Sequence, residues 1–244
     1  MNGTVLLEVE DLARRFGGVQ AVADLSFQVR AGEILGVIGP NGSGKTTTFN
    51  LITGLYRPDR GFVRFAGEDI TGLRSYAVCS RGICRTFQVA KPFRELTVLR
   101  NVLMGTLLRH SNPAVASKRA EDVLRLVGLE GRAESVAGSL TTIDQRRLEV
   151  ARALGTEPRL LLLDETMAGL TPTEVEQAIR LIAGLRSQGL TVVVVEHVMR
   201  AVMSLSDRIV VLNQGMKIAE GSPKEISSDP RVIQAYLGAE YRHA

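Results

Sequence analysis

Tryptophan is absent from this 244-residue chain, and aromatic residues make up only 5% of it. Proteins that bind single-stranded nucleic acids commonly stack bases on aromatic side chains, so this composition argues against such a surface. The formal net charge is +4 and the basic residues are scattered, since the only adjacent arginines are Arg14–Arg15 and Arg146–Arg147. A nucleic-acid binder usually gathers its basic residues on one face. We therefore expect no nucleic-acid partner.

Long apolar runs are also missing. No run approaches the roughly 20 residues that a membrane-spanning helix needs, and the first residues carry acids where a secretory signal has its apolar core. The two cysteines, Cys79 and Cys84, lie too close together to suggest a disulfide framework, and no further cysteine or histidine accompanies them at zinc-site spacing. We expect a soluble cytosolic protein in which both cysteines are ordinary buried or half-buried thiols.

Short strand-like runs alternate with helical patterns at both ends of the chain. The runs at 160–163 and 192–195 are apolar without alternation, as in parallel strands that are covered on both faces. From about residue 95 to 157 the helical period dominates and no strand run is evident. This pattern predicts an α/β core with an inserted helical block. The predicted strands are 5–10, 25–29, 33–39, 61–65, 160–165, 190–197 and 208–215, with a further short strand before Gln88.

Two of the predicted helices have clear start and stop signals. The first runs from Asn112 as N-cap, with a proline at the first helical position, to Gly128. The second starts at Thr171, where Glu174 completes a capping box, and ends at Gly189.

The stretch ILGVIGPNGSGKTTTFN carries the pattern Gly-x-x-x-x-Gly-Lys-Thr between a strand and a helix. Glycines there let backbone N–H groups close around phosphates, and the helix N-terminus adds a favourable dipole. Lys45 is expected to reach the β- and γ-phosphates, and the Thr46 hydroxyl to bind Mg²⁺. The strand–loop–helix context disfavours the alternative, a glycine-rich turn with an exposed lysine. The chain thus binds a nucleoside triphosphate, through Gly39, Pro40, Asn41, Gly42, Ser43, Gly44, Lys45, Thr46 and Thr47.

Acidic residues end another buried strand. Asp164 is placed to hold Mg²⁺ through water, and Glu165 is the candidate general base. His197 ends a second apolar strand at the same sheet edge, where it is expected to reach the γ-phosphate. Gln88, at the junction with the helical block, is placed to touch both metal and hinge. The alternatives are a solvated turn for the two acids, a surface or core histidine, and a plain polar loop residue for Gln88.

Five segments, GPNGSGKTT, RTFQ, QRRLEVARAL, LLLLDE and VVVEH, occur in this order and together resemble the ATP-binding subunit of an ABC transporter. The similarity covers nearly the whole chain and is greatest to the high-affinity branched-chain amino acid uptake subgroup. The resemblance implies one ABC ATPase domain over residues 1–244. Its core, a RecA-like P-loop NTPase with an antiparallel β subdomain, would span about 1–88 and 158–244, and an inserted helical subdomain about 89–157.

The resemblance also implies roles for single residues. Phe16 would stack on adenine, Val22 would contact ATP, and residues 39–47 match the Walker A loop. The implied catalytic residues are Glu165, His197 and Gln88, and the implied Mg²⁺ ligands are Thr46, Gln88 and Asp164.

Members of this family work as head-to-tail dimers, in which each ATP lies between one subunit's phosphate loop and the other's signature motif. The second subunit is a copy of the chain or another ABC ATPase. Closure on ATP drives an integral membrane permease, which a periplasmic or extracellular substrate-binding protein supplies. The resemblance therefore implies a peripheral protein on the cytoplasmic face of the cell membrane. Residues 89–101, VAKPFRELTVLRN, are the candidate surface for docking the permease.

The signature motif departs from the family pattern, Leu-Ser-Gly-Gly-Gln or Leu-Ser/Pro-Tyr-Gly-Asp/Glu. Ile143 replaces a glycine whose backbone N–H approaches the γ-phosphate, and a β-branched side chain would crowd that approach. Thr142 and Gln145 have capping-box spacing, which also fits a plain capped helix. Thr166 replaces the proline that usually follows the acidic pair. The signature here reads Leu140, Thr141, Thr142, Ile143, Asp144, followed by Gln145.

We hypothesise that the site completed by Thr141 and Ile143 is impaired, so that the chain forms an asymmetric heterodimer and hydrolyses ATP poorly as a homodimer. Alternatives are the ATPase of a urea or lipopolysaccharide-export transporter, and a regulatory subunit that closes on ATP without hydrolysing it. Glu165 and His197 argue against the regulatory role, and the altered signature argues for it. A non-transport ABC protein acting on DNA or the ribosome needs coiled-coil insertions or tandem domains, which 244 residues do not accommodate.

Overall fold

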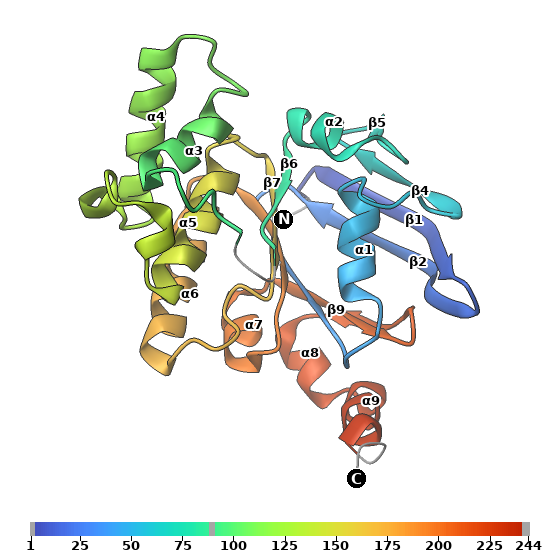
Figure 1. The fold of residues 1–244 in the computed structure, drawn as a ribbon. Coiled ribbons are helices and arrows are strands. Elements are labelled where there is room, and N and C mark those ends of the chain that lie inside the picture. Colours follow the sequence, from blue (N-terminus) through green and yellow to red (C-terminus); the bar gives the residue numbers. More distant parts are fainter. Residues whose placement is uncertain (1–2, 88–90, 241–244) are drawn as a thin grey trace.

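The computed structural model describes residues 3–87 and 91–240, and its strands form two sheets (Figure 1). The larger sheet has the strand order β10-β9-β3-β8-β7-β6. Five of its strands run parallel, and β10 pairs antiparallel with β9 at one edge. The strands are β3 (Ile34–Ile38), β6 (Ile83–Arg85), β7 (Leu160–Asp164), β8 (Thr191–Val195), β9 (Arg208–Asn213) and β10 (Met216–Gly221).

The parallel sheet is buried on both faces. Leu160 and Leu162 of β7 pack in a core that also contains side chains of the smaller sheet and of α1 (Lys45–Ile52). Leu161 and Leu163, which point to the opposite face, pack in a second core with side chains of α5 (Thr142–Leu154) and α6 (Pro172–Ser187). The prediction that this uninterrupted apolar run is a parallel strand covered on both faces is therefore confirmed.

The smaller sheet is antiparallel, and its strands exceed the sequence prediction. The predicted strands 5–10 and 25–29 are too short, because backbone pairing continues through polar residues: Arg14 pairs with Val22 and Arg15 with Gln20. Strands β5 and β10 were not predicted, since neither carries an apolar alternation. The order is β2-β1-β4-β5, with β1 (Val5–Phe16), β2 (Val19–Arg30), β4 (Arg60–Phe65) and β5 (Glu68–Asp69).

Helices α3, α4 and α5 lie in the chain between β6 and β7, and stand apart from the antiparallel sheet in Figure 1. The predicted caps are confirmed: Asn112 accepts a hydrogen bond from the N–H of Ala114, and Thr171 and Glu174 form both bonds of a capping box. Within residues 3–87 and 91–240, no helix is long and apolar enough to cross a membrane. The remaining helices are α2 (Ser75–Ser80), α3 (Val98–Thr106), α4 (Pro113–Leu126), α7 (Met199–Leu205), α8 (Pro223–Ser228) and α9 (Pro230–Glu240).

Two glycines offer a matched test of packing. A Cβ atom on Gly36 of β3 would lie 2.6 Å from Ser206 Oγ and 3.0 Å from Val202 Cγ1, whereas one on Gly184 in α6 would meet nothing within 4 Å. We expect Gly36→Ala to lower the free energy of unfolding by roughly 1–3 kcal/mol through overpacking. Gly184→Ala should raise it by about 0.5–1 kcal/mol, because alanine favours helix. Urea unfolding measures both, and an equal loss in the two variants would contradict the prediction.

Candidate active site

The glycine-rich loop joins the carboxyl end of β3 to the start of α1. Gly39 and Gly44 have φ angles of 151° and 103°. A Cβ on Gly39 would lie 2.1 Å from the carbonyl oxygen of Leu212, and one on Gly44 2.5 Å from that of Ala21, so only glycine fits at either position. The loop is thereby fixed in one tight path. Of its other residues, Asn41, Gly42 and Thr46 are exposed, Pro40 and Thr47 half-buried, and Ser43 buried.

Lys45 is buried and its side chain turns back into this loop. The ammonium Nζ donates hydrogen bonds to the carbonyl oxygens of Gly39, at 2.8 Å, and Pro40, at 3.0 Å. Burial lowers the pKa of Lys45, and the carboxylates of Glu165 and Asp164 oppose that shift. The loop therefore holds a cation in its concave side, next to the two acids.

The start of α1 is also unlike that of the longer helices. Helices α3, α4, α5 and α6 are each capped by the side chain of a threonine or asparagine. The N-cap of α1 is Gly44, which makes no side-chain hydrogen bond, and the first turn of α1, all of it described, holds no acidic residue. The first N–H groups of the helix are thus left to a ligand, and an anion is the ligand they favour.

Asp164 ends β7 and only 1% of it is exposed. Its Oδ2 accepts a hydrogen bond at 2.9 Å from Nη2 of Arg85, on the neighbouring strand β6. Its Oδ1 is buried and has no hydrogen-bond partner within the described part of the chain. Burial raises the pKa of Asp164, and the positive charge of Arg85 opposes the rise. A buried carboxylate oxygen without a partner requires an explanation, and a hard cation would supply one.

Glu165 and His197 are brought together by the register of the sheet. Asp164 pairs with Val195, so the residues that follow each strand lie side by side, and the Glu165 N–H donates to the Val195 carbonyl at 2.8 Å. Nε2 of His197 lies 2.6 Å from Oε1 of Glu165. The Glu165 side chain is 13% exposed and that of His197 41%. With Nε2 protonated, the imidazole donates to the carboxylate and holds it at the edge of the sheet.

Sequence reasoning missed two charged residues of this edge, Arg85 and Glu196. Glu196 is buried, and its Oε1 accepts hydrogen bonds from the N–H of Met167 at 2.8 Å and from the hydroxyl of Thr166 at 3.3 Å. Burial raises the pKa of Glu196. Glu196 thus fixes the backbone directly after Glu165. The sequence does show a charged residue within or directly after an apolar strand in each case. It does not show which residue each of these charges contacts.

The residues predicted to contact the nucleoside differ in exposure. Phe16 is 39% exposed, with the Tyr56 ring edge-on at 5.2 Å and the Arg14 guanidinium 4.9 Å from its centre. Val22 is fully buried, and a Cβ on Gly44 would lie 3.5 Å from its Cγ2. Phe16 therefore has exposed ring surface for a ligand, whereas Val22 packs beside Gly44 of the phosphate loop. Gln88 lies outside the described residues.

A phosphate loop, a buried strand-end acid and a glutamate–histidine pair on one sheet edge are the parts of a nucleotide-hydrolysing site. The family described as "ABC transporter" matches residues 22–168, and that described as "Branched-chain amino acid ATP-binding cassette transporter" matches residues 216–242. The chain belongs to the ABC transporter family. It is an ATP-binding cassette, and the family to which it belongs hydrolyses ATP.

Individual relatives match most of the chain. The cassette is 43% identical to the high-affinity branched-chain amino acid transport ATP-binding protein BraF of Pseudomonas aeruginosa, covering 96% of this chain and 98% of BraF. The crystal structure of the ADP conformation of an ATP-binding cassette has a TM-score of 0.87 at 32% identity, covering 96% of this chain and 99% of that one. A dimeric post-hydrolysis cassette bound to ADP and Pi has a TM-score of 0.81 at 26% identity, covering 89% and 99%. The predicted ABC fold is confirmed.

The signature segment of this cassette forms the start of α5. Thr141 is the N-cap, and its hydroxyl accepts a hydrogen bond from the N–H of Asp144 at 3.3 Å. The side chain of Gln145 donates to the carbonyl of Leu140 at 3.0 Å. The predicted capping box on Thr142 and Gln145 is therefore wrong. Thr141 is the N-cap instead, and the side chain of Gln145 bonds the carbonyl that precedes it. Thr142 is exposed.

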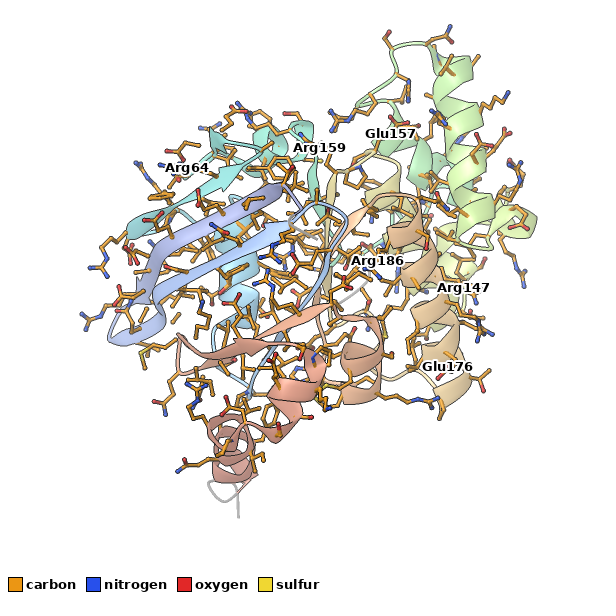
Figure 2. All side chains as sticks on the ribbon, turned by 180° about the vertical axis from the view of Figure 1, so that it is seen from behind. Arg64, Arg147, Glu157, Arg159, Glu176 and Arg186 are labelled. Atoms are coloured by element: carbon orange, nitrogen blue, oxygen red, sulfur yellow. The ribbon has the colours of Figure 1, made fainter. Side chains whose placement is uncertain are left out.

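Ile143 is half-buried and lines a cavity of about 390 Å³ between α5 and α6. Leu170 and Leu181 line the same cavity. Arg147 of α5, which Figure 2 labels, and Gln177 of α6 also line this cavity, and Nη2 of Arg147 donates to Oε1 of Gln177 at 2.6 Å. The isoleucine that replaces a glycine of the family signature thus presents an apolar side chain to the cavity between α5 and α6.

The buried Arg85–Asp164 pair predicts a large stability effect. Arg85→Met leaves a buried carboxylate without its cation, so we expect the free energy of unfolding to fall by about 3–5 kcal/mol. Arg81→Met is the matched control, because it removes the exposed ion pair between Arg81 and Glu68, and its effect should be much smaller. Urea unfolding at neutral pH measures both variants. Similar losses of unfolding free energy would show that the buried pair contributes no more to stability than the exposed one.

Proposed function

We propose that this cassette binds ATP with Mg²⁺, hydrolyses it, and powers the import of branched-chain amino acids through a membrane permease, as a peripheral subunit on the cytoplasmic face of the cell membrane. The observation that carries the hydrolytic part is the 2.6 Å contact between Glu165 and His197. Both residues lie at the sheet edge that also carries Lys45 and Asp164, so one bound triphosphate would meet all four.

The chain's own residues would act as follows. Lys45 exchanges its two carbonyl partners for oxygens of the β- and γ-phosphates. Glu165 accepts a proton from a water molecule as the water oxygen attacks the γ-phosphorus and the bond to ADP breaks. His197 holds the Glu165 carboxylate through its Nε2 donor. Phe16 stacks on the adenine through its exposed ring.

The residues present fit Mg²⁺. Because Arg85 occupies Oδ2 of Asp164, Oδ1 is the oxygen left for a metal, and among the described residues it has no other partner. Thr46 is exposed at the start of α1 and would be a second ligand. Gln88, the third proposed ligand, lies outside the described residues. Carboxylate, hydroxyl and amide oxygens suit this ion. When bound, Mg²⁺ neutralises negative charge on the phosphates.

Support for the amino acid substrate comes from the relatives. BraF is named as a branched-chain amino acid transport protein, and the description of the family that matches residues 216–242 names the same substrate class. The transported molecule passes through other polypeptides, and a periplasmic or extracellular binding protein would deliver it indirectly. The alternatives are urea transport and lipopolysaccharide export, and uptake assays distinguish them from branched-chain amino acid import.

The proposed permease contact is the described part of segment 89–101. The Phe93 ring is 48% exposed, and the Arg152 guanidinium lies 4.9 Å from its centre. The backbone of Phe93 is fixed, since its N–H donates to Oδ1 of Asn101 at 2.8 Å and its carbonyl accepts from Nδ2 of the same residue at 3.0 Å. Asn101 itself is buried. A rigidly held, exposed aromatic ring is a common anchor in protein interfaces.

A complementation experiment tests the function. Cells that lack this chain receive the wild type, Glu165→Gln or Phe93→Ala, and uptake of labelled leucine is measured. Wild type should restore uptake. Glu165→Gln should abolish it, because the general base is lost. Phe93→Ala should reduce uptake strongly while the purified variant keeps its ATPase rate, because Phe93 lies outside the hydrolytic site.

The matched control for the docking contact is Tyr76→Ala, which removes another exposed aromatic ring, 72% exposed on α2, and should leave uptake unchanged. Labelled urea, supplied in parallel, should show no dependence on the chain. Leucine uptake that is equal with and without the chain would refute the substrate, and wild-type uptake with Phe93→Ala would refute the docking surface.

We also propose that the cassette dimerises head to tail and that its signature completes a weakened site. The N–H group of Asp144 is bonded to the Thr141 hydroxyl, whereas those of Thr142 and Ile143 have no acceptor within the helix and would face the partner's γ-phosphate. Thr141 supplies a hydroxyl there, but Ile143 adds a branched side chain at the approach. A partner with an intact signature would complete the site built from Lys45, Asp164 and Glu165, which gives an asymmetric heterodimer.

Ile143→Gly tests this asymmetry. The ATPase rate of the purified chain alone should rise by about tenfold, as expected when one hydrogen bond to a charged phosphate is gained. Ile143→Ala is the control, since it keeps helix propensity while removing the β-branch, and it should give a smaller rise. Equal rates for wild type and the glycine variant would sink the hypothesis. If both bind ATP without hydrolysis, the regulatory alternative applies.

A further inference from the structure

The backbone of Glu165 has a conformation that glutamate rarely adopts. Its φ angle is 49°, in the left-handed region, where the Cβ atom of an L-residue crowds its own backbone. Such a residue keeps this conformation only where the surrounding structure holds it. Before the turn, the N–H of Glu165 donates to the carbonyl of Val195 at 2.8 Å. The contacts that hold the chain after Glu165 therefore belong to the geometry of the proposed general base.

Glu196 holds the chain after this turn. The residue is 1% exposed. Its Oε1 accepts the N–H of Met167 at 2.8 Å and the hydroxyl of Thr166 at 3.3 Å, so one oxygen holds both residues that follow Glu165. Thr166 stands where the family usually has proline, which has no hydroxyl to donate. The second hydrogen bond therefore depends on this departure from the family pattern.

Glu196 stands in the chain between the two residues that contact Glu165 itself. The carbonyl of Val195 accepts from the Glu165 N–H, and Nε2 of His197 lies 2.6 Å from Oε1 of Glu165. The neighbours of Glu196 thus hold the backbone and the carboxylate of Glu165, and Glu196 holds the two residues that follow. One short stretch at the end of β8 fixes the segment after β7 at three points.

We propose that Glu196 is a positioning residue for ATP hydrolysis. By holding Thr166 and Met167, it keeps the left-handed turn in which the carboxylate of Glu165 faces His197 and the attacking water. Glu196 acts on the reaction through the backbone of this turn, and not as an acid or a base. This inference rests on the proposed role of Glu165 as the general base.

An oxygen acceptor, rather than a negative charge, is what Glu196 supplies. Its Oε2 is buried and has no hydrogen-bond partner among the residues that the structure describes. Burial raises the pKa of Glu196, because the apolar surroundings disfavour the charged form. Oε1 accepts its two hydrogen bonds whether the carboxyl group is ionised or not. Glutamine should therefore replace Glu196, whereas a side chain without an oxygen should not.

Glu196→Gln and Glu196→Met form a matched pair, because the side chains have similar lengths and only methionine lacks the oxygen. Phosphate release from ATP labelled at the γ-position is measured with Mg²⁺ on the purified full-length chain. We expect Glu196→Met to lower kcat about ten- to a hundredfold, because a displaced base slows the chemical step. Its KM for ATP should stay within about twofold of wild type, and Glu196→Gln should keep kcat within about threefold.

The backbone contact also has a readout that does not depend on hydrolysis. The amide hydrogen of Met167 should exchange with deuterium more than about tenfold faster in Glu196→Met, and at about the wild-type rate in Glu196→Gln. Thr166→Val removes one donor and keeps the shape of the side chain. It should lower kcat at least about threefold with an unchanged KM, and it carries the test if Glu196→Met does not fold.

Glu33→Met is the control for loss of a buried glutamate away from the site. Glu33 is 8% exposed and directly precedes β3, at the end opposite to the phosphate loop, and its Oε2 accepts the N–H of Arg30 at 2.6 Å. This variant should lower the free energy of unfolding in urea without lowering kcat. A fall in kcat equal to that of Glu196→Met would show that lost stability alone slows hydrolysis, and would overturn the proposal.

Other outcomes are equally decisive. Equal losses of kcat in Glu196→Gln and Glu196→Met, a raised KM in place of a lowered kcat, or a wild-type kcat in Glu196→Met or Thr166→Val would each refute the positioning role. Glu165→Gln, measured in the same assay, separates this inference from the proposed function. A wild-type rate in Glu165→Gln would refute the general base itself. A lost rate there, beside an unchanged rate in Glu196→Met, would refute the positioning role alone.

Discussion

Burial of the parallel sheet on both faces is the constraint on which the rest of this cassette depends. The inner strands are apolar between their ends, as the four leucines Leu160 to Leu163 of β7 show, so a polar group placed there would lie in one of two apolar cores. Polar chemistry is thereby confined to the strand ends. Because the strands are parallel, their carboxyl ends meet at one edge, and the phosphate loop, Asp164, Glu165 and His197 all follow from that geometry.

The same constraint explains why the charged groups of the site are held by named partners. A buried charge costs free energy unless it is paired or hydrogen-bonded. Lys45 donates to two carbonyl oxygens of its own loop, and Arg85, Asp164 and Glu196 have partners on other strands or loops. Arg85 on β6 pairs with Asp164 on β7, and Glu196 after β8 receives the backbone N–H of Met167 after β7. These contacts cross between adjacent strand ends and tie together the elements that carry the site. Oδ1 of Asp164 and Oε2 of Glu196 are buried without a hydrogen-bond partner among the described residues, and Oδ1 of Asp164 is the oxygen that we propose for Mg²⁺.

How much of this could be predicted depends on whether a residue's role is local. The glycines of the phosphate loop and the Thr171–Glu174 cap follow from backbone geometry over a few residues, and both were predicted. Arg85 was missed because its role depends on Asp164, which lies 79 residues away in the chain. The strands β1 and β2 were predicted too short because backbone pairing, which carries no side-chain pattern, extends both of them.

The helix that carries the signature also fixes the segment proposed to contact the permease. Glu149 of α5 is buried, and its Oε1 accepts hydrogen bonds at 2.8 Å from the N–H of Lys91 and from Arg152. Arg152 in turn donates to the Lys91 carbonyl at 2.8 Å and lies over the Phe93 ring. Thr141, at the other end of the same helix, would face the partner's ATP. These hydrogen bonds make α5 a link between Thr141 at its start and Phe93 beside its last turn, while Asn101 of α3 holds the Phe93 backbone as well.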